Sequence, residues 1–450
     1  MKKASLLSEK VRQFLNILLP ILITQLSLGA TSFFDTVMSG NASQNDLAGV
    51  AIGANLWMPI FTGVNGVLVG ITPILAQLHG AGKKETMPII VMQGIYLAVV
   101  LTLLLLICGP LILTQIFAVM RLESSVRDIA YQFLAALSLG MFPLFVSAVL
   151  RNFIDALGYT RVTMIIALCA LPINIVLNYL LIFGNFGFPR LGGAGAGYAS
   201  AVTYWCILFI SLLVVHRTKP FKDYRIFNRL YGVSLIIWKE LLMVGIPIGS
   251  SIFCEVSIFG VVALLMAEFG TEIIAAHQAA INFASLIYII PLSIGMALTI
   301  VIGFEVGARR YEDARQYSLL GVGIAIAVAL FFAGGLSLFS HQIAGLYTNS
   351  PIVLQLIQSF LAYAVLFQLS DAFAAPIQGA LRGYKDVKVT LIMAIVSYWI
   401  IGMPTGYILA KYNTSPYGYW IGLITGLAVG AIVLSVRLIR LQKKYIKNYS

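Results

Sequence analysis

The chain has 450 residues, of which 60% are hydrophobic and only 10% are charged. Soluble domains carry roughly 25% charged residues, so this composition excludes a water-soluble fold and a disordered chain. The formal net charge is +12, and in so apolar a chain we expect the excess cations in the cytoplasmic loops of a membrane protein, not on a surface that binds nucleic acid.

Apolar segments long enough to cross a bilayer follow one another along the whole chain. A transmembrane helix needs roughly 20 apolar residues. The first segment is too long for the apolar region of a signal peptide, so we predict that it is retained. In chain order, the twelve predicted spans are 12–35, 47–77, 89–114, 128–150, 162–183, 194–215, 236–266, 275–304, 316–340, 353–378, 389–410 and 416–437.

The 29 Lys and Arg residues fall mostly on one side of these spans. If both termini lie inside, 25 cations are inside and 4 are outside, at Arg121, Arg127, Arg190 and Lys411. This split follows the positive-inside rule and supports the span count, because losing one helix would scramble the alternation. We expect a multi-pass protein of the cell (plasma or inner) membrane with both termini in the cytoplasm.

The two halves of the chain resemble each other at a fixed offset. A shift of 227 residues without gaps aligns Pro20 with Pro247 and Asn55 with Asn282, and four further identities fall at corresponding points of corresponding spans. A repeat of six helices returns the chain to the same side. We therefore predict an all-α integral membrane fold of twelve transmembrane helices in two six-helix bundles, related by a pseudo-two-fold axis along the membrane normal.

The hydrophilic joint between the bundles predicts an N-terminal lobe of residues 1–225 and a C-terminal lobe of residues 226–450. Two equivalent bundles facing one another make a central cavity that can open to either side. This is the architecture of alternating-access transporters, and it is not expected of a single-bundle receptor.

Three of the 17 carboxylates fall inside predicted spans, at Asp35, Glu255 and Asp371. A charge at the bilayer centre costs at least about 2.5–3.5 kcal/mol, so each needs a partner or a function. At about 1.5 Å per residue, Glu255 and Asp371 lie about 22 and 16 Å above the inner side, so one cavity can contain both. The alternatives are a hydrogen-bonded structural acid at Glu255 and, at Asp371, a carboxylate that satisfies backbone groups freed by Pro376.

Polar side chains on other spans reach the level of Asp35. Asn174 and Asn178 are spaced i, i+4 and share one helix face, and Ser200 on the next span falls at a similar height. Such oxygen ligands suit a hard cation such as Na⁺, and the carboxylate alone can carry H⁺. The alternative for Asp35 is an interfacial acid at a helix end. We expect no intramembrane Lys or Arg to neutralise any of the three acids.

Further side chains within the spans are candidates for lining the cavity. The amides among them have helix–helix hydrogen bonding as an equal alternative. We expect the aromatic rings to lie near the acids, where they could face a substrate, and core packing is the commoner role of each. The candidate lining residues are Asn55, Gln278, Asn282, Phe253, Phe283 and Phe367.

Four short stretches carry a family resemblance that covers nearly the whole chain. They are FDTVMSG at 34–40, LGGAGAG at 191–197, AAHQ at 275–278 leading to NF at 282–283, and PLSIG at 291–295. Together they resemble the multidrug and toxic compound extrusion (MATE) transporters, most closely their bacterial NorM-like branch. The resemblance implies a secondary active exporter of amphipathic, often cationic drugs, driven by antiport of Na⁺ or H⁺.

The resemblance also implies two cation sites. The first-lobe site is matched by Asp35, Asn174 and Asn178, with Ser200 where the family usually has Thr. The second-lobe acidic site is matched by Glu255 and Asp371. Phe367 stands where the NorM-like branch often has Tyr, so this ring offers no hydroxyl to Na⁺. We expect Na⁺, if it is the coupling ion, at one of these two sites. We expect no other cofactor and no catalytic residue.

Other functional classes require side chains that this sequence does not show. A flippase for lipid-linked or polysaccharide precursors needs a cationic cavity for phosphates, whereas this chain places acids in its spans. An integral-membrane enzyme needs catalytic residues clustered at one interface, and the four histidines form no HExxH pair. The expected partners are small amphipathic or cationic drugs and membrane lipids, with no nucleic acid, and the expected state is a monomer.

Overall fold

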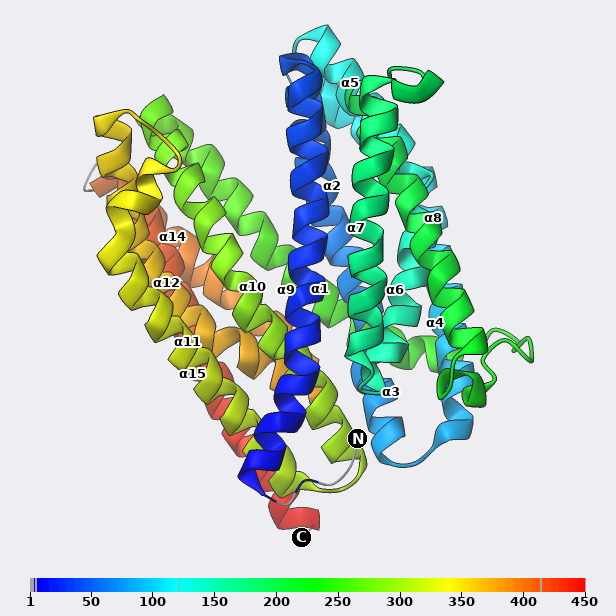
Figure 1. Ribbon diagram of the computed structural model, residues 1–450. Helices are drawn as coiled ribbons and strands as arrows, with labels where there is room; N and C mark the ends of the chain where they lie inside the picture. Colours follow the sequence, from blue (N-terminus) through cyan, green and yellow to red (C-terminus); the bar gives the residue numbers. More distant parts are fainter. Residues whose placement is uncertain (1–3, 5, 121, 413–414, 450) are drawn as a thin grey trace. The chain divides into compact units, whose positions relative to one another are not determined.

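The computed structural model describes residues 4, 6–120, 122–412 and 415–449 (Figure 1). Arg121, counted above among the outer cations, lies outside this range. Helices fill nearly all of the described residues, and no strand occurs among them. The α-helices are α1 (Leu7–Ala42), α2 (Gln44–Val69), α3 (Ile71–Gly80), α4 (Met87–Val119), α5 (Ser124–Ser138), α6 (Met141–Ala156), α7 (Thr160–Phe183), α8 (Gly193–Arg217), α9 (Leu235–Met266), α10 (Thr271–Gly307), α11 (Tyr311–Gly345), α12 (Pro351–Gly383), α13 (Val387–Ala394), α14 (Met403–Tyr412) and α15 (Tyr417–Tyr449). The shorter elements are four 3₁₀ turns, η1 (Lys84–Thr86), η2 (Asn185–Gly187), η3 (Phe221–Tyr224) and η4 (Ala267–Phe269), and a π-helical segment, η5 (Ile395–Gly402).

Every predicted span has a helical counterpart. Within the described ranges, 11 helices are long and apolar enough to cross a membrane, and the pair α5 and α6, bent by 50°, makes a twelfth if it counts as one span. Some spans are composite, since α2 continues into α3, and α13, η5 and α14 together form one span. On α4, Leu104, Ile107 and Leu111 are more than half exposed, as expected of a surface that meets lipid. The prediction of an all-α multi-pass membrane protein is confirmed.

Two compact units divide the chain by contact. The N-unit is Leu19–Gly249, and the C-unit combines Met1–Leu18 with Ser250–Ser450. Both α1 and α9 therefore begin in one unit and continue into the other. The predicted lobes, 1–225 and 226–450, group helices by their repeat, whereas the units group residues by packing, so residues 1–18 and 226–249 change sides.

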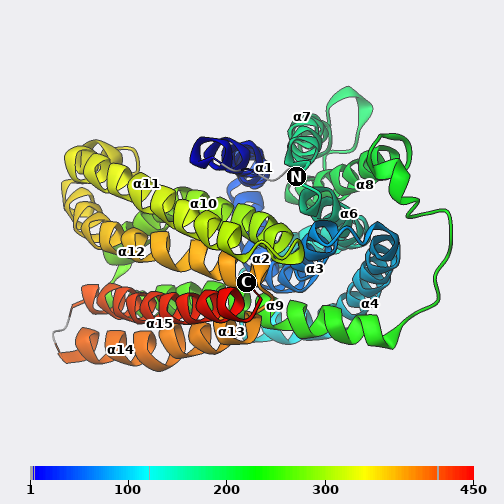
Figure 2. The ribbon, with the colours of Figure 1, turned by 90° about the horizontal axis from the view of Figure 1, so that it is seen from below.

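In the N-unit, a glycine-rich start lets α8 approach its neighbours at backbone distance, and Figure 2 shows α8 beside α6 and α7. A Cβ at Gly195 would lie 2.7 Å from the backbone of Leu181 in α7, and one at Gly197 would lie 2.5 Å from the Phe133 carbonyl oxygen in α5. Asp46 of α2 accepts a hydrogen bond from the Gly193 amide at 2.6 Å and so caps α8. These contacts fix the position of α8 against α5 and α7.

In the C-unit, α10 and α12 make a similarly close contact. A Cβ at Gly295 would lie 2.7 Å from the Ala375 carbonyl oxygen, and one at Gly379 would collide with the Gly295 backbone. Thr299 Oγ1 donates to the Gly379 carbonyl across the two helices at 2.9 Å. Small residues thus hold α10 and α12 together in the half of each helix that lies toward its C-terminus.

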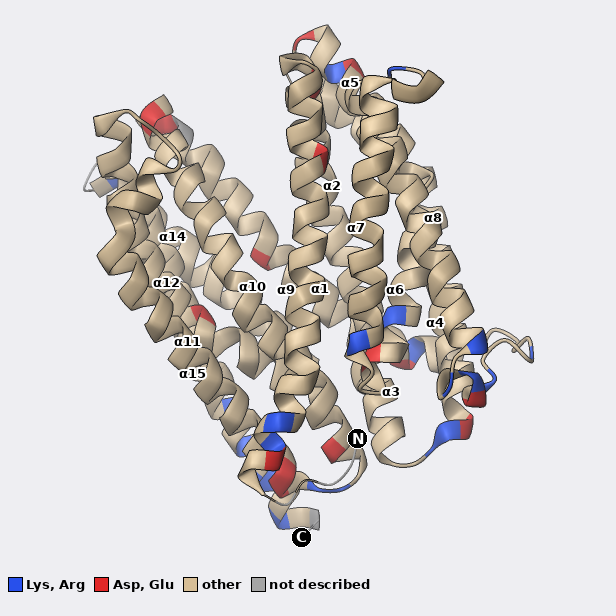
Figure 3. Ribbon diagram, viewed as in Figure 1, with Lys and Arg blue, Asp and Glu red and all other residues tan. Residues whose placement is uncertain are grey.

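Charged residues are sparse within the helix bodies of both units (Figure 3). Lys and Arg gather at one end of the helices in each unit, and only a few acidic segments interrupt the apolar stretches. Lys10 in α1 is a buried cation: it is 3% exposed and donates to Asp313 Oδ1 and Gln316 Oε1 of α11, both at 2.5 Å. This contact holds the first turns of α1 in the C-unit.

Candidate cation and substrate sites

The four residues predicted for the first-lobe site form a closed ring of hydrogen bonds in the N-unit. Asp35 of α1 accepts from Asn178 Nδ2 of α7 at 2.6 Å and from Ser200 Oγ of α8 at 2.8 Å. Asn178 Nδ2 also donates to Asn174 Oδ1 at 3.0 Å, and Asn174 Nδ2 donates to Ser200 Oγ at 3.4 Å. Three helices therefore meet at one carboxylate.

Asp35 is half-buried, and its three partners in this ring are buried and neutral. Asn174 and Asn178 are 0% exposed and Ser200 is 2% exposed. The Asn178 Oδ1 atom is buried without a hydrogen-bond partner, so it can accept one more contact. Among the described residues, no three His, Cys, Asp or Glu side chains gather as metal ligands. A cation held here would have to use the mixed amide, hydroxyl and carboxylate oxygens of the ring.

A tyrosine that the sequence reasoning missed belongs to the same site. Tyr204 of α8 lies close enough to Asp35 for a direct electrostatic interaction. It follows Ser200 by four residues, so the two share a helix face. The i, i+4 spacing that identified the asparagine pair could have identified Tyr204 as well.

The two predicted acids of the second-lobe site come together in the C-unit. Asp371 of α12 is 3% exposed and interacts electrostatically with Glu255 of α9. Tyr288 of α10 donates a hydrogen bond from its hydroxyl to Glu255 Oε1 at 3.1 Å. The close contact of α10 with α12 brings Tyr288 and Asp371 to the same place.

A further tyrosine, which the sequence reasoning did not assign, belongs to this site. Tyr398 is 2% exposed in the π-helical segment η5 and interacts electrostatically with Glu255 and Asp371. Its hydroxyl lies close enough to Glu255 to interact with that carboxylate. π-Helical turns are frequent at functional sites.

Arg382 corrects one expectation about the acids. It is 8% exposed and interacts electrostatically with Glu255 and Tyr288. The prediction that no intramembrane Lys or Arg would neutralise an acid is therefore wrong for Glu255. The physical reason is that α12 continues as a packed helix to Gly383, so Arg382, which the sequence suggested as a loop cation, lies inside the C-unit.

The polar candidates for cavity lining are exposed on their helices. Asn55 is exposed on α2, and Gln278 and Asn282 are exposed on α10. Tyr347 donates from its hydroxyl to Asn282 Oδ1 at 3.1 Å. Asn55 and Asn282, which the 227-residue shift aligns, thus both lie on the surface of their units.

The three aromatic candidates differ in their surroundings. Phe253 is 46% exposed and Phe283 is half-buried. Phe367 is 5% exposed, and its ring packs edge-to-face against Phe259 and Trp420, with centroids 5.7 and 6.3 Å apart. Phe367 therefore belongs to the packed core of the C-unit.

Known proteins resemble the chain along its whole length. The MatE family model matches residues 20–180 and again residues 247–408, with starts separated by the 227 residues of the predicted repeat. The probable multidrug resistance protein NorM of Bacillus subtilis (strain 168) is 56% identical and covers 99% of both chains. The protein of the same name from Bacillus anthracis is 54% identical over 99% of this chain and 98% of its own length.

Solved structures share the fold. An outward-facing multidrug resistance MATE family transporter of the MOP superfamily superposes with a TM-score of 0.88 at 22% identity, covering 99% of this chain and 100% of the other. The eukaryotic MATE transporter AtDTX14 superposes with a TM-score of 0.83 at 22% identity, covering 98% and 99%. At this identity the two structures establish the fold alone.

Proposed function

The chain belongs to the MatE family, and on that premise we propose that it is a secondary active multidrug exporter, in which entry of Na⁺ or H⁺ drives drugs out of the cell. Family membership makes it a transporter and not an enzyme. The relatives that are 54–56% identical over 99% of the chain are named as multidrug resistance proteins. At that identity over the full length, the same class of cargo is the expectation for this chain.

The ring around Asp35 is the observation that carries the coupling proposal. Its hydrogen bonds, within the described part of the chain, come from neutral amide and hydroxyl groups and none from Lys or Arg. A carboxylate enclosed by buried neutral groups, without a cationic side chain, is stabilised when a cation from solution neutralises it. We assign that role to one H⁺ or Na⁺ per cycle, with Asn174, Asn178 and Ser200 as the supporting ligands.

The second site supports cationic cargo. Glu255 and Asp371 bring two negative charges, and Arg382 brings one positive charge that acts on Glu255. The cluster therefore keeps a net negative charge when both acids are ionised, which attracts a cationic drug or a second coupling ion. The hydroxyls of Tyr288 and Tyr398 add polar contacts that are oriented toward the same acids.

The transport cycle follows from the repeat. We propose that the lobes 1–225 and 226–450 alternate access to a pathway lined by exposed side chains such as Asn55, Gln278, Asn282 and Phe253. Neutralisation of Asp35 changes the packing of α1 against α7 and α8, and the lobe then releases cargo outward. In this proposal the protein acts as a monomer in the cell membrane, with both termini in the cytoplasm.

The experiment is efflux of a fluorescent cation from vesicles that contain the purified protein, with Na⁺ and pH gradients imposed separately. We expect one gradient to accelerate efflux, and its dissipation by an ionophore to stop the acceleration. An efflux rate that is the same with and without either gradient would contradict the antiport. Failure to transport any cationic dye would contradict the multidrug function.

A further inference from the structure

A second polar site lies in the N-unit, under the connector between α8 and α9, which we define as residues 218–234. Its first anchor is aromatic. Phe221 and Tyr224 are buried, and their rings meet Phe153 of α6 edge-to-face with centroids 6.3 and 5.5 Å apart. These contacts fix the connector at the end of α6.

The second anchor is a set of hydrogen bonds to α4. Gln93 is 0% exposed, donates from Nε2 to the Gly232 carbonyl at 2.8 Å and accepts from the Ser234 amide at 3.0 Å. Tyr96 donates from its hydroxyl to the Tyr231 carbonyl at 2.9 Å. With both ends fixed, residues 225–230 are held facing the first turn of α4.

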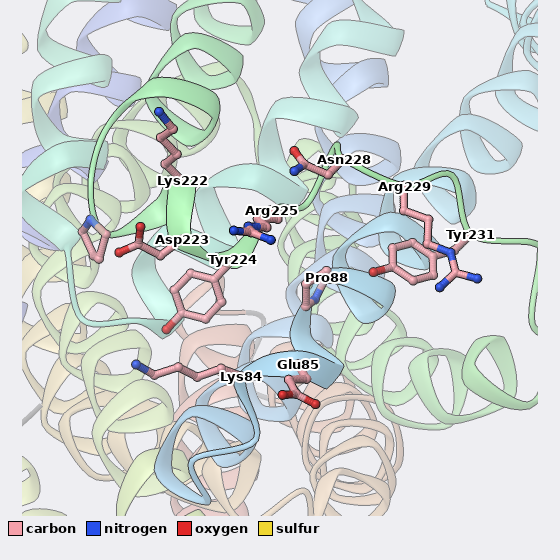
Figure 4. Close-up of a pocket in the computed structure, with 11 residues that line it drawn as sticks. Lys84, Glu85, Pro88, Lys222, Asp223, Tyr224, Arg225, Asn228, Arg229 and Tyr231 are labelled. Carbon is pink, nitrogen blue, oxygen red and sulfur yellow. The ribbon is translucent and has the colours of Figure 1, made fainter.

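A cavity of about 720 Å³ lies between this segment and the start of α4 (Figure 4). Two acids, Glu85 and Asp223, also line it. The four cationic residues that line it are Lys84, Lys222, Arg225 and Arg229. Within the described residues, none of the four takes part in an ion pair. The pocket therefore has a net charge of +2 and cationic donors without an acidic partner.

One of these cations, Arg225, stands on an unusual backbone turn. Arg225 has φ +51°, a left-handed conformation that is uncommon outside glycine. Figure 4 shows its guanidinium between Tyr224 and Asn228. The Asn228 amide donates to the Arg225 carbonyl at 3.2 Å and helps to hold the turn. Strained backbone at a non-glycine residue is often found where a side chain must be placed for binding.

We propose that this pocket binds the phosphate group of an anionic phospholipid. The membrane span that contains α4 begins at Lys84, so the pocket lies where the hydrocarbon ends and the headgroups begin. A phosphodiester carries one negative charge and several acceptor oxygens, which match Arg and Lys donors. Binding of the group lowers the net charge of the pocket from +2 to +1.

The apolar side chains beside the pocket favour a lipid over a free phosphate ion. Leu230, Val233 and Ile236 are 86%, 61% and 84% exposed. A soluble anion gains nothing from these side chains, whereas the acyl chains of a lipid bury them. Anionic lipids also attract basic segments next to membrane helices.

The test uses the full-length protein in a neutral detergent, with bound lipid counted by native mass spectrometry. Phosphatidylglycerol and phosphatidylcholine are titrated separately at equal mole fractions. We expect phosphatidylglycerol to bind about tenfold more tightly, because only its headgroup has a net negative charge, whereas the choline of phosphatidylcholine cancels the charge of its phosphate. Equal binding of the two lipids would overturn the proposal.

The pocket variant is Lys222→Gln/Arg225→Gln/Arg229→Gln. The matched control, Arg217→Gln/Lys219→Gln/Lys239→Gln, removes the same charge from exposed residues that do not line the pocket. We expect the preference for phosphatidylglycerol to vanish in the pocket variant and to persist in the control. An equal loss of this preference in both variants would show that it depends on general surface charge, and it would contradict a specific binding site in the pocket. Arg229→Gln alone, which should lose part of the preference, replaces the triple variant if that variant does not elute as a folded protein.

A third arm separates the two sources of phosphate. Inorganic phosphate is added to lipid-free protein, and the midpoint of thermal unfolding is followed. We expect a much smaller stabilisation than phosphatidylglycerol gives at the same concentration. Inorganic phosphate could instead stabilise the wild type as strongly as the lipid does and give no stabilisation of the pocket variant. In that case the ligand is a soluble phosphate compound and the lipid assignment is wrong.

Discussion

At the scale of single residues, both units hold acidic side chains within predicted membrane spans, and they surround these acids with different groups. The N-unit surrounds one carboxylate, Asp35, with neutral dipoles. The C-unit places two carboxylates near each other, and the buried Arg382 acts electrostatically on Glu255. Removing a charge should therefore have different consequences in the two units.

We expect Asp35→Asn to keep part of the drug binding and to lose efflux driven by the ion gradient by about tenfold or more, because the amide mimics permanent neutralisation. Binding and gradient-driven efflux are measured on the same purified variant. The control is Asp128→Asn, which alters an acid whose side chain is 64% exposed in α5. If efflux by the Asp35 variant still depends on the gradient, Asp35 is not the coupling residue, and the coupling role would fall to the acids of the C-unit.

Asp371→Asn and Glu255→Gln should both reduce efflux by about tenfold or more, since each removes a charge from the cluster. Their stabilities should differ. Neutralising Asp371 relieves repulsion from Glu255, so thermal stability should not fall. Neutralising Glu255 removes the negative charge that acts on the buried Arg382, so stability should fall. Glu272→Gln, at an exposed acid of α10, is the control. Equal melting temperatures for the two variants would argue against the Arg382 interaction.

How much of these sites the sequence predicts depends on how unusual each residue is in its span. Asp35, Asn174 and Asn178 could be predicted because polar residues are rare in apolar helices and their spacing placed two of them on one face. Tyr288 and Tyr398 could not be singled out among 21 tyrosines, many of which serve as interfacial anchors.

At the scale of helices, breaks and bends follow from contacts between elements. The break between α2 and α3 falls at Gly70, where a Cβ would lie 2.6 Å from Gly245 of α9. The bend between α5 and α6 and the π-helical turn of η5 are likewise absent from the hydrophobic pattern. Apolar length therefore predicts where a span lies, and long-range packing decides whether it is continuous.

Gly379→Ala tests how closely α10 and α12 must approach. An added methyl group collides with the Gly295 backbone, and overpacking of this kind costs about 1–3 kcal/mol. We expect a lower melting temperature and reduced efflux, because Asp371 on α12 shifts relative to Tyr288 on α10. Gly323→Ala in α11 is the control, since its Cβ meets nothing within 4 Å. The same stability in both variants would show that the close approach is dispensable.

At the scale of the whole molecule, duplication and packing divide the chain differently. The sequence repeat could be predicted, and the two matches of the family model confirm it. The bounds of the compact units could not be predicted, because they depend on contacts such as that of Lys10 with Asp313. Orientation in the membrane stays a prediction from the distribution of cations.

That orientation is tested by labelling single cysteines in intact cells after the four native cysteines have been replaced. A membrane-impermeant thiol reagent should modify Ser43→Cys, and it should modify Lys222→Cys only after the cells are permeabilised. The expectation rests on the cation split, which places the connector in the cytoplasm. Modification at position 222 and protection at position 43 would invert the topology.

The passage of α1 and α9 through both compact units has a consequence for cutting the polypeptide. A break in the connector yields a first fragment that retains Lys10 without Asp313, and a second that retains the start of α9 without the N-unit helices against which it packs. Neither fragment then contains a complete unit. We expect each to be degraded when expressed alone and both to accumulate when expressed together, as measured by immunoblot of membranes. Stable accumulation of either fragment alone would contradict this mutual dependence. Because α1 and α9 each contribute residues to both units, we expect the two halves of the duplicated chain to fold only together.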